Sequence, residues 1–219
     1  MHNTEKQFNV AGWGLFFHPE FIRNSNLGKK IREYTFFRYD ENEALHLSFD
    51  ELNTLTTIIQ QIEKEYQTNI DKHSTDLLLS NLELLLNYCK RFYDRQFITR
   101  TNTSKDIIAK FELFLIEYFN AEKSKIEGLP TVMMCAEKMN LSPNYLSDLL
   151  KNETGKNAQE HIHFHLLDRA KMLLLSTNNT VNEIAFDLGF EYPQNLSALF
   201  KRKIGFSPTE YRKQQNLCN

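Results

Sequence analysis

An internal repeat in the C-terminal half is the feature that most constrains what this chain can fold into. The two copies are TVMMCAEKMN-LS-PNYLSDLLKNETG and TVNEIAFDLGF-EY-PQNLSALFKRKIG. Their equivalent pairs are Thr131 and Thr180, Pro143 and Pro193, and Gly155 and Gly205. Proline is favoured in the first turn of a helix, and glycine is favoured just after the last turn. Each copy therefore predicts two helices joined by a sharp turn.

The residue pattern of each copy is that of a helix-turn-helix unit. A small residue, Ala136 or Ala185, lies in the first helix, where the second helix must cross closely. The second helices have an apolar inward face, made of Leu146, Leu149, Leu150, Leu196, Leu199 and Phe200. We therefore predict helix-turn-helix units over about 131–154 and 180–204.

The opposite faces of the two second helices are polar. They carry Asn144, Ser147, Asp148 and Lys151 in the first unit, and Gln194, Asn195, Ser197, Ala198 and Lys201 in the second. Amides and hydroxyls on one helix face suit the base edges of the DNA major groove. These residues are the candidate contacts to DNA bases and phosphates.

A linker helix is predicted between the units, over residues 157–176. A 20-residue helix is about 30 Å long, and successive major grooves on one face of DNA lie about 34 Å apart. The spacing therefore favours two recognition helices that enter successive grooves of double-stranded DNA.

The rest of the chain predicts a helical hairpin preceded by short strands. GWGLFFHPEF and REYTFFRYD are aromatic-rich and read as strands, with a loop between them. Ser48 and Glu51 form a capping box, and apolar residues then recur at helical spacing to Tyr66 and again over 72–93. TRTNTSKD (99–106) is expected to be a polar linker, followed by a helix over 107–119. The predicted fold class is mainly α, with a short β-strand remnant.

Composition argues against a membrane-spanning, secreted or disulfide-bonded protein, but it does not by itself indicate DNA binding. The net charge is −2. Residues 129–219 carry ten Lys+Arg and nine Asp+Glu, a net charge of +1. The rest of the chain carries 16 Lys+Arg and 19 Asp+Glu, a net charge of −3. That is a weak basic footprint for a DNA-binding protein. The three cysteines have no metal or disulfide spacing. With no membrane span and no secretory signal, we expect a cytoplasmic, nucleoid-associated protein.

The C-terminal region resembles the DNA-binding domain of the AraC/XylS family of bacterial transcription regulators. The resemblance rests on LSPNYLSDLLKNETG, DRAKMLLLST and TVNEIAFDLGFEYPQNLSALFKRKIGFSPTEYRK. It implies a DNA-binding domain over 106–214 and a partial sensor and dimerisation region over 1–105. That region resembles the end of the family's sensor domain, but only about 45 residues precede the hairpin, so the barrel and its ligand cavity are expected to be incomplete.

The resemblance implies that the exposed faces of both recognition helices contact bases and phosphates. The basic cluster at the end of the second helix adds Arg202 as a candidate phosphate contact. Asp148 and Ala198 depart from the pattern, because many family members carry arginine there. Asp148 can accept a hydrogen bond from cytosine, and Ala198 can offer only apolar contact. We therefore expect an unusual target sequence.

Several features have a plain structural explanation beside the functional one. His161 and His165 have a workable zinc spacing, but a solvated helix face is the favoured reading, and no metal or cofactor is predicted. Lys201-Arg202-Lys203 is a phosphate clamp or a helix end that complements the dipole. Cys135 is a packed residue rather than a redox switch. The apolar residues of the 48–95 hairpin form either a homodimer seam or the hairpin's own core; they are Leu52, Leu55, Ile59, Ile62, Leu78, Leu82 and Leu85.

The leading hypothesis is a sequence-specific transcription regulator, an activator by family resemblance, with RNA polymerase as a possible partner. The alternative is an interaction protein whose weakened DNA surface no longer binds specifically. An enzyme is excluded as a hypothesis, because the sequence has no nucleophile elbow, no phosphate-binding loop and no convincing metal set.

Overall fold

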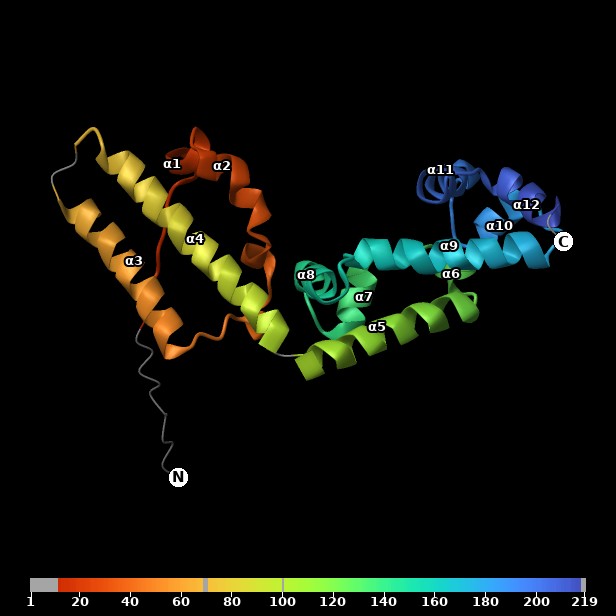
Figure 1. Ribbon diagram of the computed structural model, residues 1–219, viewed down its shortest axis with the longest axis horizontal. Coiled ribbons are helices and arrows are strands. Elements are labelled where there is room, and N and C mark those ends of the chain that lie inside the picture. The colour runs from red at the N-terminus through yellow and green to blue at the C-terminus, as the bar shows by residue number, and fades with distance from the viewer. Residues whose placement is uncertain (1–11, 69–70, 100, 218–219) are drawn as a thin grey trace, which may run out of the picture.

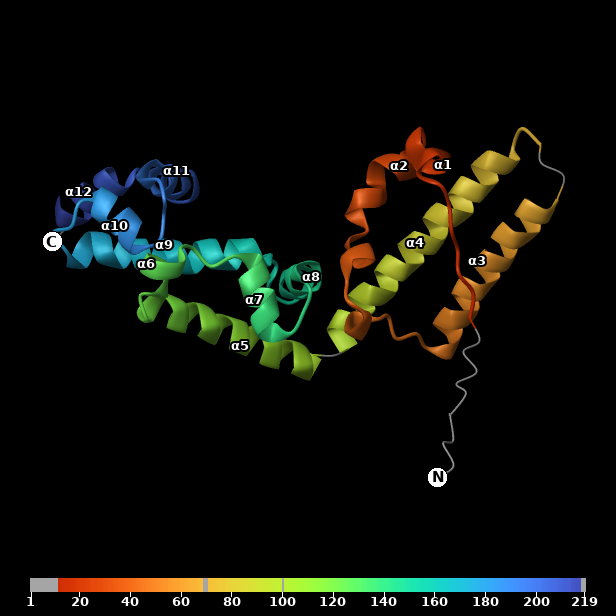
Figure 2. The ribbon, with the colours of Figure 1, turned by 180° about the vertical axis from the view of Figure 1, so that it is seen from behind.

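The computed structural model describes residues 12–68, 71–99 and 101–217, and this part of the chain contains helices but no strand. Figure 1 shows two lobes, one built from α1 to α4 and the other from α5 to α12. In the view from behind, the lobes meet where the end of α4 lies beside α8 (Figure 2). The mainly α fold class is confirmed.

The predicted β-strand remnant is wrong. The first aromatic run leads into α1 (Pro19–Arg23) and is followed by α2 (Asn26–Lys30). The second run forms short 3-10 turns over Ile31–Glu33 and Thr35–Arg38, before another at Glu41–Glu43. Its aromatic rings pack on α4 (Ser74–Thr99); the ring of Phe36, for example, stacks on that of Tyr93 with centroids 5.4 Å apart. Burial on a helix gives this segment no neighbouring strand with which to share ladder hydrogen bonds.

The predicted hairpin is confirmed as α3 (Phe49–Gln67) and α4. Ser48 and Glu51 form the expected capping box at the start of α3. Glu51 also pairs with Arg95 of α4 at 2.8 Å, which fixes the open end of the hairpin. The buried core of the hairpin is made of Leu55, Ile58, Ile62, Leu85 and Phe92.

The expected linker at 99–106 is helical, which corrects the prediction. α5 (Thr101–Asn120) begins inside that stretch, and a short helix, α6 (Lys123–Glu127), occupies the predicted break after it. Polar composition favoured a linker, but Ser104 is buried and Ile107 and Ile108 pack against the first helix-turn-helix core. Tertiary packing therefore continues the helix through a weakly helix-forming sequence.

The helices predicted for the two units and the linker are confirmed, and one more helix follows them. They are α7 (Val132–Met139), α8 (Pro143–Thr154), α9 (Ala158–Ser176), α10 (Val181–Asp187), α11 (Pro193–Ile204) and α12 (Pro208–Leu217). One apolar core lies around α7 and α8, and another around α10 and α11. Both cores include residues of α9, so the linker helix packs against both units and joins them (Figure 1).

Candidate nucleic-acid interface

The second unit is built as the repeat predicts. Thr180 and Glu183 form a capping box that starts α10, and the fully buried Ala185 lies in the core against α11. α11 begins at Pro193 and ends at Ile204, and the next residue, Gly205, forms a left-handed cap with φ of 92°.

The outward face of α11 is open. Gln194, Asn195 and Ala198 are exposed, and Ser197 is half-buried. Lys201 and Arg202, at the other end of the helix, are also exposed. This arrangement presents two amides for base edges and two cations for phosphates on one helix.

The first unit has the same construction with a different turn. Cys135 and Ala136 are buried in α7, and Asn140 turns the chain in the left-handed conformation with φ of 54°. Ser142 then caps α8 by accepting a hydrogen bond from the Tyr145 N–H at 3.2 Å.

The outward face of α8 is partly engaged inside the protein. Lys151 is exposed, whereas Asn144, Ser147 and Asp148 are half-buried. The Ser147 hydroxyl accepts a weak hydrogen bond from the Ala158 N–H, at 3.4 Å. The Asp148 carboxylate accepts one from the Tyr39 hydroxyl at 2.7 Å. The predicted contacts of the first unit therefore lie together on one helix, but they are less accessible than those of the second.

The partners of α8 in the N-terminal lobe have no signal in the sequence. Glu43 is 2% exposed, and its carboxylate accepts hydrogen bonds from the N–H and the hydroxyl of Ser142, both at 2.5 Å. Burial, followed by the hydrogen bond to Asp148, raises the pKa of Tyr39 far above its ordinary value. Tyr39 and Glu43 lie about 100 residues before their partners, so only the fold brings them together.

Two histidines of α9 form a structural clamp. The solvated helix face predicted for His161 and His165 is wrong, because His161 is buried and His165 is half-buried. Glu112 of α5 contacts His161 Nδ1 with one carboxylate oxygen at 2.7 Å and His165 Nε2 with the other at 2.5 Å. Thr154 Oγ1 lies 2.8 Å from His161 Nε2. The described residues contain no group of three or more side chains suited to hold a metal ion. The Glu112 carboxylate, which no sequence pattern linked to these histidines, therefore ties α5 to the linker helix.

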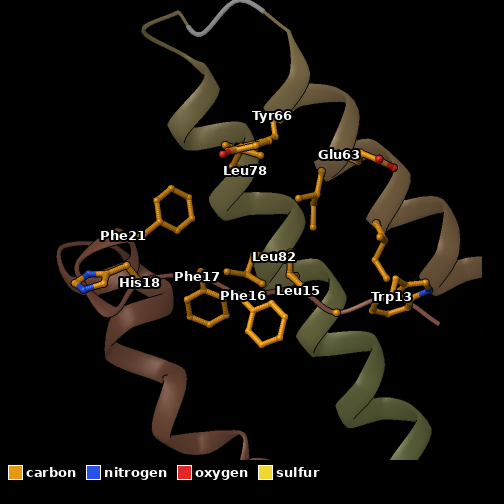
Figure 3. A pocket seen from close by; sticks show the side chains of 13 residues that line it. Trp13, Leu15, Phe16, Phe17, His18, Phe21, Glu63, Tyr66, Leu78 and Leu82 are labelled. Carbon is orange, nitrogen blue, oxygen red and sulfur yellow. The ribbon is translucent and has the colours of Figure 1, made fainter. Parts of the chain in front are cut away.

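A separate apolar hollow of about 680 Å³ lies in the N-terminal lobe (Figure 3). Its walls include Trp13, Phe16 and Phe17 from the segment before α1, and Leu78 and Leu82 from the first half of α4. The second half of α4 is the part that contacts α8, through residues such as Phe97. The hollow is therefore not part of the candidate interface.

Within the described residues, no helix combines the length and apolarity needed to cross a membrane.

Known proteins match the C-terminal region of this chain. A family model described as a helix-turn-helix domain matches residues 135–214. The HTH-type transcriptional regulator YtdP of Bacillus subtilis (strain 168) is 34% identical over 91 residues, which are 42% of this chain and 12% of that protein. The HTH-type transcriptional activator RhaS of Escherichia fergusonii is 36% identical over 78 residues, 36% of this chain and 28% of that protein.

A solved structure, the C-terminal domain of the response regulator AraT from Geobacillus stearothermophilus, is 30% identical with a TM-score of 0.43. That match covers 49% of this chain and 84% of the AraT domain.

The matched stretch is a small part of the curated relatives, between 12% and 28% of the two named above. Both names describe transcription regulators, and the family-model match lies on the repeat that forms α7 to α11. The C-terminal region of this chain is therefore an AraC-type double helix-turn-helix domain of the AraC/XylS regulator family.

Proposed function

We propose that this chain is a sequence-specific DNA-binding transcription regulator that places α8 and α11 in successive major grooves of its operator. The observation that carries the proposal is the exposed face of α11, where Gln194 and Asn195 precede Lys201 and Arg202. Side-chain amides pair with adenine, and cations neutralise phosphates. Such a face has no role in the core of its own unit, which uses the opposite side of the helix.

The linker helix supports the spacing in this proposal. α9 has 19 residues, which corresponds to about 28 Å at the usual helical rise. That length is close to one helical turn of DNA, about 34 Å. Because residues of α9 belong to both apolar cores, the two units are held at a set separation.

We propose that the chain activates transcription, by analogy with RhaS, whose name describes an activator. Contact with RNA polymerase is part of that proposal.

We also propose that the 48–95 hairpin pairs with a second copy. Leu55, Ile62 and Leu85 are used within the hairpin, but Leu52 and Leu77 are exposed on it. Sedimentation of wild type against a Leu52→Ser, Leu77→Ser variant tests the dimer.

Selection of binding sites from random duplex DNA at near-physiological salt tests DNA recognition. We expect a consensus that includes an element read by α11. Asn195→Ala and Gln194→Ala should relax specificity within that element only. Lys201→Ala should weaken all sites alike, since a phosphate contact carries no sequence information. Recovery of no consensus, with weak and unselective retention on DNA, would support the alternative of an interaction protein.

A further inference from the structure

We propose that residues 39–43, the latch, are an intramolecular competitor of DNA that covers the first recognition helix and leaves only α11 free to read DNA. The inference rests on the proposed function and adds its regulation. Until the latch is displaced, the protein reads a single DNA element. Displacement of the latch, together with the end of α4 that packs beside it, exposes α8 and completes the two-element site.

The first part of the competition is at the amino end of α8. The free N–H groups and the dipole of a helix attract an anion there, and a DNA phosphate is the usual anion in a complex. In this protein that position is taken by the Glu43 carboxylate, which accepts hydrogen bonds from the N–H and hydroxyl of Ser142. Glu43 is almost fully buried, and its own position is set by a hydrogen bond from the Asp40 N–H at 2.8 Å. The latch therefore supplies the negative charge that a phosphate would supply.

The second part is on the side of α8 that would face the bases. The Tyr39 hydroxyl donates a hydrogen bond to Asp148, as the amino group of a cytosine would. The Tyr39 ring meets the Tyr145 ring edge to face, with centroids 5.1 Å apart. Phe97 of α4 also packs against Tyr145, with ring centroids 5.0 Å apart. The Asp148 carboxylate is thus satisfied by a protein hydroxyl that donates as a base amino group would.

The third part is steric. The major groove is about 12 Å wide and admits one helix. α4 lies against α8, and a hollow between them is bordered by Lys90 and Asp94 of α4 and by Lys151 and Asn152 of α8. α8 cannot enter a groove while α4 and the latch occupy this face. The exposed face of α11 has no such cover.

The repeat explains why the latch fits only the first unit. Its short polar contacts are with Ser142 and Asp148, and the equivalent positions of the second unit are Tyr192 and Ala198. A longer contact, of 3.4 Å, joins the Asn42 side-chain amide to the carbonyl of Asn140 in the turn before α8. Tyr192 makes no side-chain cap on α11, and alanine cannot accept a hydrogen bond. The latch therefore depends on the residues that distinguish the first unit from the second.

The test compares wild type with a Tyr39→Phe, Glu43→Gln double variant, both as full chains. Each is put through site selection and then footprinting on its selected duplex. The matched control is Glu41→Gln, an exposed carboxylate in the same turn. We expect wild type and the control to protect one element. The double variant should protect two elements about one helical turn apart and bind the longer site at least about tenfold more tightly, which is about 1.4 kcal/mol.

A second measurement does not depend on the double variant folding. Lys151 of α8 and Lys201 of α11 are both exposed, so their replacement by alanine leaves the fold intact. In wild type we expect Lys201→Ala to weaken binding severalfold more than Lys151→Ala does. Equal losses from the two variants, or protection of both elements by wild type, would overturn the latch while the proposed function stands. Failure of every protein to select any sequence would instead remove the proposed function, and the latch with it.

Discussion

Gly189, in the turn of the second helix-turn-helix unit, is fixed by both backbone conformation and space. Its φ is +90°, and a Cβ there would lie 2.5 Å from the carbonyl oxygen of Ser124 and 2.9 Å from the carbonyl carbon of Gly128. Gly155 has a similar φ of +77°, but nothing lies within 4 Å of a Cβ built on it. A side chain at Gly155 would therefore meet conformational strain alone, whereas a side chain at Gly189 would meet the same strain and a clash with the backbone.

We expect Gly155→Ala to destabilise the protein by about 1–2 kcal/mol, the cost of a left-handed residue with a side chain. Gly189→Ala should cost about 1–3 kcal/mol more, because the backbone of the α6 region must move. Urea unfolding of the two variants measures the difference. Equal losses would show that the contact with Ser124 is easily relieved.

His163 gives the stability a pH dependence whose sign follows from its surroundings. Burial first, and then the charges of Lys203 and Arg202, lower its pKa below the ordinary 6.5. The folded protein therefore favours the neutral ring, and the unfolded chain takes up the proton first as the pH falls below 6.5. Stability is retained above that pH and is lost as the pH drops toward the lowered pKa.

Replacing His163 with glutamine should reduce the stability lost between pH 7.5 and pH 5, as measured by thermal unfolding. The exposed His73 is the matched control, and His73→Gln should leave the pH profile close to that of wild type. An unchanged profile in the His163 variant would contradict the assignment.

At the scale of the elements, the clamp between α5 and α9 holds the helix that precedes the repeat against the linker helix. Glu112 contacts both His161 and His165. Removing it leaves one buried and one half-buried imidazole without that partner, at a cost of about 1–3 kcal/mol. We expect Glu112→Ala to lower the free energy of unfolding by that amount. Glu117→Ala, at an exposed position of the same helix, should change it by less than about 0.5 kcal/mol.

At the scale of the whole molecule, the small net charge of −2 leaves DNA affinity to local cations rather than to an overall basic field. The logarithm of the DNA-binding constant should fall linearly with the logarithm of salt concentration. Lys201→Ala should reduce the magnitude of that slope by about 1. Lys64→Ala, on α3 in the other lobe, should not change the slope. A slope unaffected by Lys201→Ala would remove this residue from the phosphate contacts.

The C-terminal architecture was predictable because its signals are local. Thr180 with Glu183, Pro193 and Gly205 mark the helix boundaries within a few residues of the groups they satisfy. The α3–α4 hairpin was predictable for the same reason, from the Ser48 and Glu51 capping box and the apolar periodicity. The DNA contacts of α8 and α11 stay a prediction.

What the sequence by itself determined is the α3–α4 hairpin, the helices of the two helix-turn-helix units with their linker helix, and the repeat that pairs the units, since helical periodicity and capping act over a few residues. Only the tertiary structure decided the conformation of the aromatic segment before the hairpin and the contacts of the first recognition helix. The aromatic runs do not form strands because their side chains pack on an apolar surface of α4. Asp148 and Ser142 acquired Tyr39 and Glu43 as partners because packing joins residues about 100 positions apart. Contacts at that separation depend on the whole fold, and no local pattern encodes them.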